Sequence, residues 1–216
     1  MNGKYLLLTG YMLVVFSTCL FSQDNWTLKL NKEGIKVYTK NLDNSPYKAI
    51  KTICTINASV KKITAVLLDV NTGADWIYAT KKCFLLKQVS PSELFYYSEI
   101  AIPWPVSNRD FIVHLKVWQD KKTNIVTVEG ENMPAYLPEY KNLVRIQQSY
   151  SKWLLTPLAN GQVQIEHLLQ VDPGGAVPAW LINMFATKGP YESFKNLRLQ
   201  VKKQLYAQVN LPFIRD

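Results

Sequence analysis

The chain contains little of the chemistry that metal and nucleotide sites require. Its 216 residues include only three cysteines and two histidines. None of them has the spacing of a zinc site, and no glycine-rich segment follows the pattern of a phosphate-binding loop. The sequence therefore argues against a metal centre and against a nucleotide site, and we expect no cofactor.

Acidic residues are also in short supply, with 16 of them against 25 lysines and arginines and a formal net charge of +9. Such an excess suggests an anionic partner, either a lipid headgroup surface or a nucleic acid. The basic residues form no run, however, and the aromatic residues do not alternate with arginines as on many nucleic-acid-binding surfaces. We expect transient contact with a membrane surface and no nucleic acid partner.

A long apolar run occurs at the N-terminus. Lys4 precedes an almost wholly apolar stretch from Tyr5 to Phe21, and Ser22-Gln23-Asp24 is polar. This order is typical of a secretory signal peptide, and we predict that residues 1–22 form one. The run is slightly short for a membrane-spanning helix, which disfavours an uncleaved anchor.

The three cysteines bear on where the protein resides. Lipidation at Cys19 is an alternative to simple cleavage, although Phe16-Ser17-Thr18 matches a lipobox poorly. We expect an exported protein, periplasmic or secreted, that is membrane-anchored only if the N-terminal segment is retained or Cys19 is lipidated. Cys54 and Cys83 could form a disulfide in an oxidising compartment. Both occur in apolar strand patterns, so two buried free thiols are the simpler expectation.

Residues 23–216 read as one domain, because no internal repeat or linker is visible and 48% of the chain is apolar. Apolar and polar residues alternate in eight segments, which predicts eight strands. These segments are 35–40, 47–56, 83–89, 93–102, 111–118, 124–130, 143–155 and 162–171. Short turns join the last six, which indicates an antiparallel meander.

Two helices are predicted. Asn57-Ala58-Ser59 caps the first, whose apolar residues recur at helical spacing through Leu67. Pro178 begins a long C-terminal helix, which Gly189-Pro190 should kink or interrupt. This helix carries an apolar stripe, formed by Phe194, Leu197, Val201 and Leu205, and a basic stripe, formed by Lys195, Arg198, Lys202 and Lys203.

A long antiparallel sheet curls because its strands twist, and one amphipathic helix can then cover its concave face. The order of elements therefore predicts an α+β helix-grip fold, in which a curved antiparallel sheet wraps around a long C-terminal helix. A hydrophobic cavity remains wherever the helix does not fill the concavity.

Three local motifs occur in this frame. The first is Pro103-Trp104-Pro105-Val106-Ser107-Asn108-Arg109-Asp110-Phe111, where two prolines stiffen an exposed turn and the Arg-Asp pair can pin that turn to the next strand. The second is Ser151-Lys152-Trp153 with Thr156-Pro157. The third is Asp172-Pro173-Gly174-Gly175 followed by Pro178-Ala179-Trp180-Leu181-Ile182-Asn183. With these motifs, residues 26–205 resemble the START (steroidogenic-acute-regulatory-related lipid transfer) domain family.

The resemblance implies a cavity that shelters one lipid, and a mouth gated by the turn before the Arg-Asp strand and by the C-terminal helix. In this sequence the gate would consist of Trp104, Pro105 and Val106 together with Trp180, Met184 and Phe194. We expect a monomer that binds a single lipid or other hydrophobic ligand without catalysis, either to transfer it or to sense it.

Strand parity predicts which side chains face the cavity, because alternate residues point to opposite faces of a sheet. Together with the gate, it provides the candidate ligand-binding residues. These are Tyr96, Ser98, Ile100, Ile102, Trp104, Phe111, Val113, Leu115, His167, Leu169, Trp180, Met184 and Phe194. Some sterol-carrying members of the family bury an acidic residue and an arginine at the positions of Tyr96 and Leu115. Neither residue is charged here, so the resemblance does not extend to a sterol ligand.

The alternative is an enzyme of the helix-grip superfamily, cyclase-like or hydrolase-like, acting on a hydrophobic small molecule. No paired carboxylates share an inward face, and no nucleophile lies beside a base in a recognisable motif. Catalysis would have to depend on Tyr96, Ser98 and His167, with Arg145 as a further candidate. We therefore predict no catalytic residues.

Overall fold

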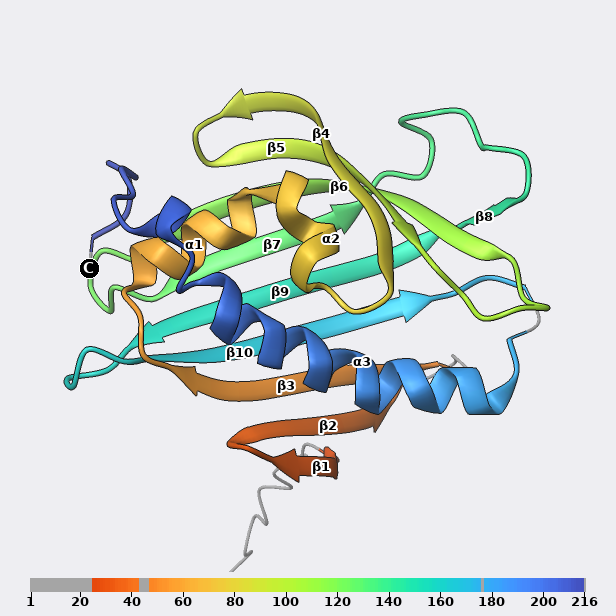
Figure 1. The fold of residues 1–216 in the computed structure, drawn as a ribbon, viewed down its shortest axis with the longest axis horizontal. Coiled ribbons are helices and arrows are strands. Elements are labelled where there is room, and N and C mark those ends of the chain that lie inside the picture. The colour runs from red at the N-terminus through yellow and green to blue at the C-terminus, as the bar shows by residue number, and fades with distance from the viewer. Residues whose placement is uncertain (1–24, 43–46, 176, 216) are drawn as a thin grey trace, which may run out of the picture.

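The computed structural model describes residues 25–42, 47–175 and 177–215. The predicted signal peptide and Cys19 lie outside the described residues. Ten strands of the described chain form one sheet, in the order β1-β2-β3-β10-β9-β7-β6-β5-β4, with β8 paired to β6 (Figure 1). Their bounds are β1 (Thr27–Lys32), β2 (Ile35–Asn41), β3 (Lys48–Ile56), β4 (Thr80–Ser90), β5 (Glu93–Ile100), β6 (Asn108–Gln119), β7 (Val126–Asn132), β8 (Leu143–Arg145), β9 (Gln148–Pro157) and β10 (Val163–Asp172).

The helices lie on one side of this curved sheet (Figure 1). They are α1 (Val60–Leu68), α2 (Gly73–Trp76) and α3 (Ala179–Gln200), with short 3-10 turns η1 (Val70–Thr72) and η2 (Gln204–Tyr206). Helix α3 packs on β2 and β3, α1 packs on β7 and β9, and α2 packs on β4 and on α3. The predicted helix-grip architecture is therefore confirmed.

The ends of the elements follow from local chemistry. The side chain of Ser59 accepts a hydrogen bond from the backbone N–H of Lys62 and caps α1 as predicted. Strand β1 was not predicted, and it extends the sheet at its edge. It joins β2 through Glu33 and Gly34, which have φ values of 52° and 69°. A two-residue turn with positive φ at both positions matches the twist of the strands that it connects.

Two predicted elements differ from those observed. The single predicted strand 143–155 is divided into β8, which runs parallel to β6, and β9, which pairs antiparallel with β7 and β10. The predicted interruption at Gly189-Pro190 does not occur, because α3 continues through Pro190 to Gln200, although the helix changes direction near its middle, as predicted for a kink (Figure 1). Proline removes one backbone donor from this helix, and the buried apolar face of the helix outweighs that loss.

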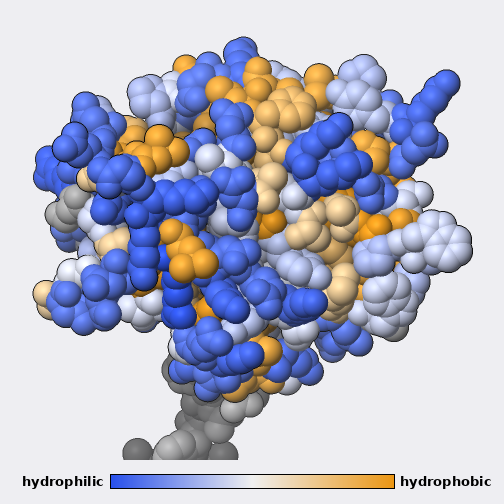
Figure 2. Space-filling model, in the orientation of Figure 1, coloured by the Kyte–Doolittle hydropathy of each residue, from blue (hydrophilic) through white to orange (hydrophobic). Residues whose placement is uncertain are grey.

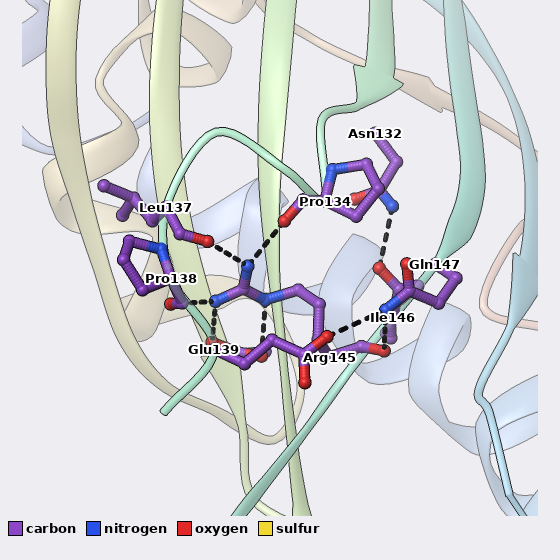
Figure 3. A network of polar contacts seen from close by, with 9 residues as sticks. Asn132, Pro134, Leu137, Pro138, Glu139, Arg145, Ile146 and Gln147 are labelled. Atoms are coloured by element: carbon purple, nitrogen blue, oxygen red, sulfur yellow. Dashed lines mark hydrogen bonds and ion pairs between the residues drawn. The ribbon is translucent and has the colours of Figure 1, made fainter. Parts of the chain in front are cut away.

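The division between β8 and β9 is caused by a buried ion pair on the convex face of the sheet. The Arg145 guanidinium donates to both carboxylate oxygens of Asp110, each at 2.9 Å, and both side chains are 1% exposed or less. Its other donors bind the carbonyls of Pro134, Leu137 and Pro138 at 2.7–3.1 Å (Figure 3). The segment between β7 and β8 is thus folded around the Arg145 guanidinium. Because Arg145 lies on the convex face, it is outside the cavity and cannot serve there as the catalytic residue that the enzyme alternative would need.

Aromatic side chains complete this outer layer. Tyr136 stacks on Phe95 at 4.7 Å, and Phe95 stacks on His114 at 4.2 Å between ring centroids. The β7–β8 segment therefore covers the outer sides of β5 and β6, which explains why Ile112 is completely buried on the convex face.

The main core lies between the concave face and the helices. Ile35, Leu155 and Ile165 of the sheet pack with Phe194 and Leu197 of α3, and all are 1% exposed or less. Cys54 and Cys83 belong to this core as free thiols, which confirms the simpler of the two expectations. Burial raises their pKa values to about 11 and about 12.

The Asp110–Arg145 pair provides a test of this arrangement. Asp110→Asn leaves a buried guanidinium without its counter-charge, and we expect a loss of about 3–5 kcal/mol in the free energy of unfolding. Chemical denaturation of the wild type and the variant measures this loss. Asp75→Asn, which breaks the exposed pair between Asp75 and Lys203, should cost less than about 1 kcal/mol. Similar losses in both variants would contradict the role assigned to the buried pair.

Candidate functional site: the concave interior and its mouth

The register of β5 and β6 places the predicted side chains on the concave face. Tyr96 pairs with Val113, and Leu94 pairs with Leu115. Leu94, Val113 and Leu115 are at most 6% exposed. The predicted facing of these two strands is therefore what the structure shows, while the contact of these residues with a ligand remains a prediction.

A cavity of about 60 Å³ lies between this face and helices α1 and α2. It is lined by Val66, Leu67, Asp69, Val70, Gly73, Trp76, Ile77, Cys83, Tyr96, Leu115, Val128, Gly130, Ser151 and Trp153. An apolar cavity that binds benzene has about 150 Å³. This space can therefore hold a small polar group, and a whole lipid chain needs more room than this conformation provides.

The other predicted site residues fall into three groups. Ser98 and Phe194 are buried, at 2% and 1% exposure. Ile100, Ile102, Phe111, Leu169 and Met184 are half-buried. Trp104 and Trp180 are exposed, at 91% and 51%. Only Tyr96 and Leu115 of the predicted set line the enclosed cavity.

His167 lies on the concave face, as predicted. Its ring stacks on Trp153 at 3.8 Å between centroids, and Phe194 of α3 lies beyond it at 6.1 Å. Its Nε2 forms a 3.0 Å hydrogen bond with the Ser151 hydroxyl. The ring keeps a partial exposed surface, but it lies among side chains deep in the concavity. This burial lowers its pKa to about 3, so the imidazole is neutral at physiological pH.

The mouth is held together by Arg109, which is 3% exposed. Its guanidinium donates to the carbonyls of Pro173 and Gly174, both at 3.1 Å, and to the carbonyl of Ser107. Arg109 thus pins the Trp104 turn, as predicted, and also joins it to the turn that precedes α3. Asp110 does not share in this role, because it points to the opposite face and pairs with Arg145.

The β5–β6 connection and the start of α3 lie at the same end of the molecule, at the right of Figure 1. A groove of about 630 Å³ lies near this end, among the ends of β7, β9 and β10. Its lining is mostly polar and consists of Leu42, Tyr47, Glu131, Asn132, Gln147, Gln148, Ser149, Tyr150, Gln170, Val171 and Asp172. The segments that carry Trp104 and Trp180 therefore lie at the same end of the molecule as this groove, and neither tryptophan lines it.

The basic stripe predicted on α3 is not a free cationic surface. Arg198 donates to the carbonyls of Glu33 and Thr55. Lys203 pairs with Asp75 at 2.9 Å. Lys195 and Lys202 are exposed, but this end of α3 lies away from the mouth (Figure 1). The stripe mainly fastens α3 to the sheet and to α2.

Sequence reasoning missed the contribution of α1 and α2 to the cavity. Trp76 ends α2 and lines the cavity with Asp69 and Gly73. A Cβ at Gly73 would lie 2.8 Å from the Cys83 sulfur, which shows how closely α2 approaches β4. Ser151 was recognised only as part of a motif. Parity within β9 could have placed it inward, had the strand been divided at the correct residue.

The surface seen from the helix side shows apolar residues in separate patches among hydrophilic ones (Figure 2). Among the described residues, no helix combines the length and apolar character needed to cross a membrane.

A curved antiparallel sheet closed by a long C-terminal helix defines the helix-grip class of proteins. The sequence model of the START domain matches residues 9–205, and the chain belongs to the START domain family. A Pseudomonas aeruginosa protein is 32% identical over 181 residues, which are 84% of this chain and 89% of that protein. Mouse phosphatidylcholine transfer protein is 24% identical over 179 residues, with 80% of this chain and 82% of that protein covered.

Solved structures agree with this assignment. The STAR-related lipid transfer protein of Xanthomonas axonopodis is 33% identical, with a TM-score of 0.77 over 83% of this chain and all of that one. Human STARD10 has the same fold, with a TM-score of 0.71 and 20% identity over 83% of this chain and 74% of that one.

The depressed pKa of His167 predicts acid-sensitive stability. Between pH 6.5 and about 3, the unfolded chain binds a proton at this histidine and the folded protein does not. The free energy of unfolding should therefore decrease as pH falls through this window, by up to about 1.4 kcal/mol per pH unit. Denaturation at several pH values should show a shallower decrease for His167→Gln than for the wild type. His114→Gln, on the convex face, is the control. Equal acid sensitivity in the wild type and His167→Gln would refute the assignment.

Proposed function

We propose that this protein binds one lipid or other hydrophobic ligand between the concave face of its sheet and α3, and carries it between membranes without chemical change. The observation that carries this proposal is the concave face itself. Its inward residues on β5 and β6 are predominantly apolar, and two exposed tryptophans, Trp104 and Trp180, lie on the turn before β6 and at the start of α3. The names of the related proteins, which include lipid transfer proteins, support the same activity.

Lipid entry requires the interior to widen, because the enclosed cavity has only about 60 Å³. Burying an acyl chain favours such widening by about 0.8 kcal/mol per methylene. The apolar contacts that the ligand makes can thus replace those lost when a helix moves away from the sheet.

The distribution of polar contacts along α3 indicates which part moves. Tyr191 donates to the Glu33 carboxylate at 2.8 Å, the Ser193 hydroxyl accepts from the Tyr78 N–H at 2.9 Å, and Arg198 binds two carbonyls. These contacts all follow Pro190. Before it, the Phe185 ring lies 5.9 Å from the Tyr78 ring between centroids, and the Lys188 ammonium lies 5.8 Å from the centroid of the same ring. The first half of α3 is thus held by these ring contacts and by the packing of Leu181 and Ala186, which are buried. Because burial of ligand chains can replace such apolar packing, we propose that this half moves when a ligand enters.

Chemistry at the Ser151–His167 pair is the alternative function. A hydrolase would need this histidine as a general base, with a pKa near the working pH. Burial lowers the His167 pKa to about 3, so the ring accepts a proton only weakly at neutral pH. The pair is better suited to hydrogen bonding than to proton transfer, and we propose a non-enzymatic role.

Trp104 and Trp180 would make the membrane contact. Tryptophan prefers the interface between lipid and water, where its ring is in an apolar environment and its N–H reaches polar groups. Because Arg109 joins the two turns that carry these residues, insertion of Trp104 would also orient the start of α3. We further propose that residues 1–22 direct export, so that this contact is made with a membrane outside the cytoplasm.

Lipid extraction and native mass spectrometry of the purified protein test ligand binding directly. We expect one bound lipid per chain. Leu115→Trp fills the cavity that Leu115 lines and should reduce the bound fraction at least tenfold. Leu154→Trp makes the same change on the convex face and should leave binding unchanged. Circular dichroism checks that both variants fold, and equal lipid content in both would reject the interior as the binding site.

Membrane contact is tested by sedimentation with vesicles. The double variant Trp104→Ala/Trp180→Ala loses two interfacial side chains, and we expect about tenfold weaker binding to vesicles. Trp118→Ala removes a tryptophan that is 43% exposed, close to the 51% of Trp180, from the opposite end of β6 and should have no effect. A loss of binding in Trp118→Ala equal to that in the double variant would place the contact elsewhere.

A further inference from the structure

The enclosed cavity contains an unpaired hydrogen-bond donor. Trp76 is 4% exposed, and its indole N–H has no partner among the described residues. An indole N–H can donate and cannot accept. Leaving such a group buried and unpaired costs free energy, and most buried polar groups therefore have a protein, water or ligand partner. Trp76 lines the cavity, and an acceptor of a ligand bound there would satisfy the N–H wherever it comes within hydrogen-bond distance.

Two hydroxyl groups line the same cavity, those of Tyr96 and Ser151. Ser151 is held by its 3.0 Å hydrogen bond with His167. Burial lowers the pKa of His167 to about 3 and raises that of Tyr96, so both groups are neutral. A hydroxyl bound to a neutral imidazole can either donate or accept, depending on the tautomer of the ring. The residues that line the cavity thus include one group that can only donate a hydrogen bond, the Trp76 N–H, and two hydroxyls that can donate or accept, those of Tyr96 and Ser151.

The charge of the lining excludes an anionic occupant. No lysine or arginine is among the described residues that line the cavity, and Asp69 is the one ionisable carboxyl group there. Asp69 accepts a 2.8 Å hydrogen bond from Tyr206. A phosphate in this space would be desolvated beside a carboxylate, without a cation to compensate it. A cationic group is not an acceptor and would leave the Trp76 N–H unpaired.

From these contacts we infer that Trp76, Tyr96 and Ser151 bind an uncharged hydroxyl group at the polar end of the ligand. This inference rests on the proposed function and specifies its ligand class as neutral lipids, such as diacylglycerols, in preference to phospholipids. The volume of about 60 Å³ suits one polar group, in place of a few water molecules. The chains of the ligand would then extend along the concave face toward Trp104 and Trp180.

The position of the cavity agrees with this orientation. It lies beneath α1 and α2, away from the β5–β6 connection (Figure 1). A ligand that enters between the two exposed tryptophans would reach it polar end first, and its apolar chains would remain beside the half of α3 that precedes Pro190.

Uptake from vesicles distinguishes the ligand classes. Donor vesicles of phosphatidylcholine contain a trace of either dioleoylglycerol or dioleoylphosphatidic acid, which share their acyl chains. We expect the wild type to take up dioleoylglycerol at least tenfold better than the phosphatidic acid or the phosphatidylcholine. Trp76→Phe keeps the aromatic ring and removes the N–H, and Ser151→Ala removes one hydroxyl. Each should reduce dioleoylglycerol uptake about five- to tenfold, while Trp118→Phe, the same change outside the cavity, should not.

A second measurement observes the donor itself. The indole N–H resonance of Trp76, assigned by its loss in Trp76→Phe, should shift downfield when dioleoylglycerol binds and should be unchanged with phosphatidic acid vesicles. Uptake of all three lipids without preference, or dioleoylglycerol uptake that is equal in Trp76→Phe and the wild type, would overturn this inference and leave lipid binding intact. If no lipid is taken up by the wild type, both the inference and the proposed function fail.

Discussion

Two neighbouring residues at the start of β6 connect the sheet to what covers it on each face. The Arg109 side chain extends to the mouth and binds carbonyls from the Trp104 turn and from the turn before α3. Asp110 points to the convex face, where Arg145 gathers the segment between β7 and β8. Adjacent residues of a strand point to opposite faces. Arg109 therefore holds the Trp104 turn and the turn before α3 on one side of the sheet, and Asp110 holds the segment between β7 and β8 on the other. Neither guanidinium can reach bulk water, which makes these contacts costly to lose.

This fastening leaves one part of the fold comparatively free. The sheet is closed at its convex face by aromatic stacking and by the ion pair, and the second half of α3 is bound to β2, β3 and α2 through side chains that follow Pro190. The first half of α3 buries Leu181 and Ala186 and has a half-buried Met184 and an exposed Trp180. The opening proposed for a hydrophobic ligand would separate this mainly apolar packing, while the sheet that would bind the ligand keeps its shape.

The interior combines apolar walls with a small number of neutral polar groups. Such a lining holds a lipid mainly through apolar burial, which is strong and unspecific, and selects it through a few hydrogen bonds. The neutral state of His167 fits the proposed selection, because a protonated imidazole would attract phosphate into the concavity. Burial against Trp153 and Phe194 prevents that protonation.

The sequence by itself determined the class of fold and the facing of the strands, because alternation has a period of two residues and can be read locally. It also identified the Trp104 turn and the Asp172-Pro173-Gly174-Gly175 turn, since proline and glycine act on the backbone where they occur, while the structure showed that Arg109 joins them. The size of the cavity and the roles of Trp76, Ser151 and Arg145 were decided by tertiary structure. Arg145 pairs with a residue 35 positions away, and Trp76 reaches the cavity only because Gly73 allows α2 to approach Cys83. Such contacts depend on how closely segments that are far apart in the sequence pack against one another, and local sequence patterns do not predict that packing.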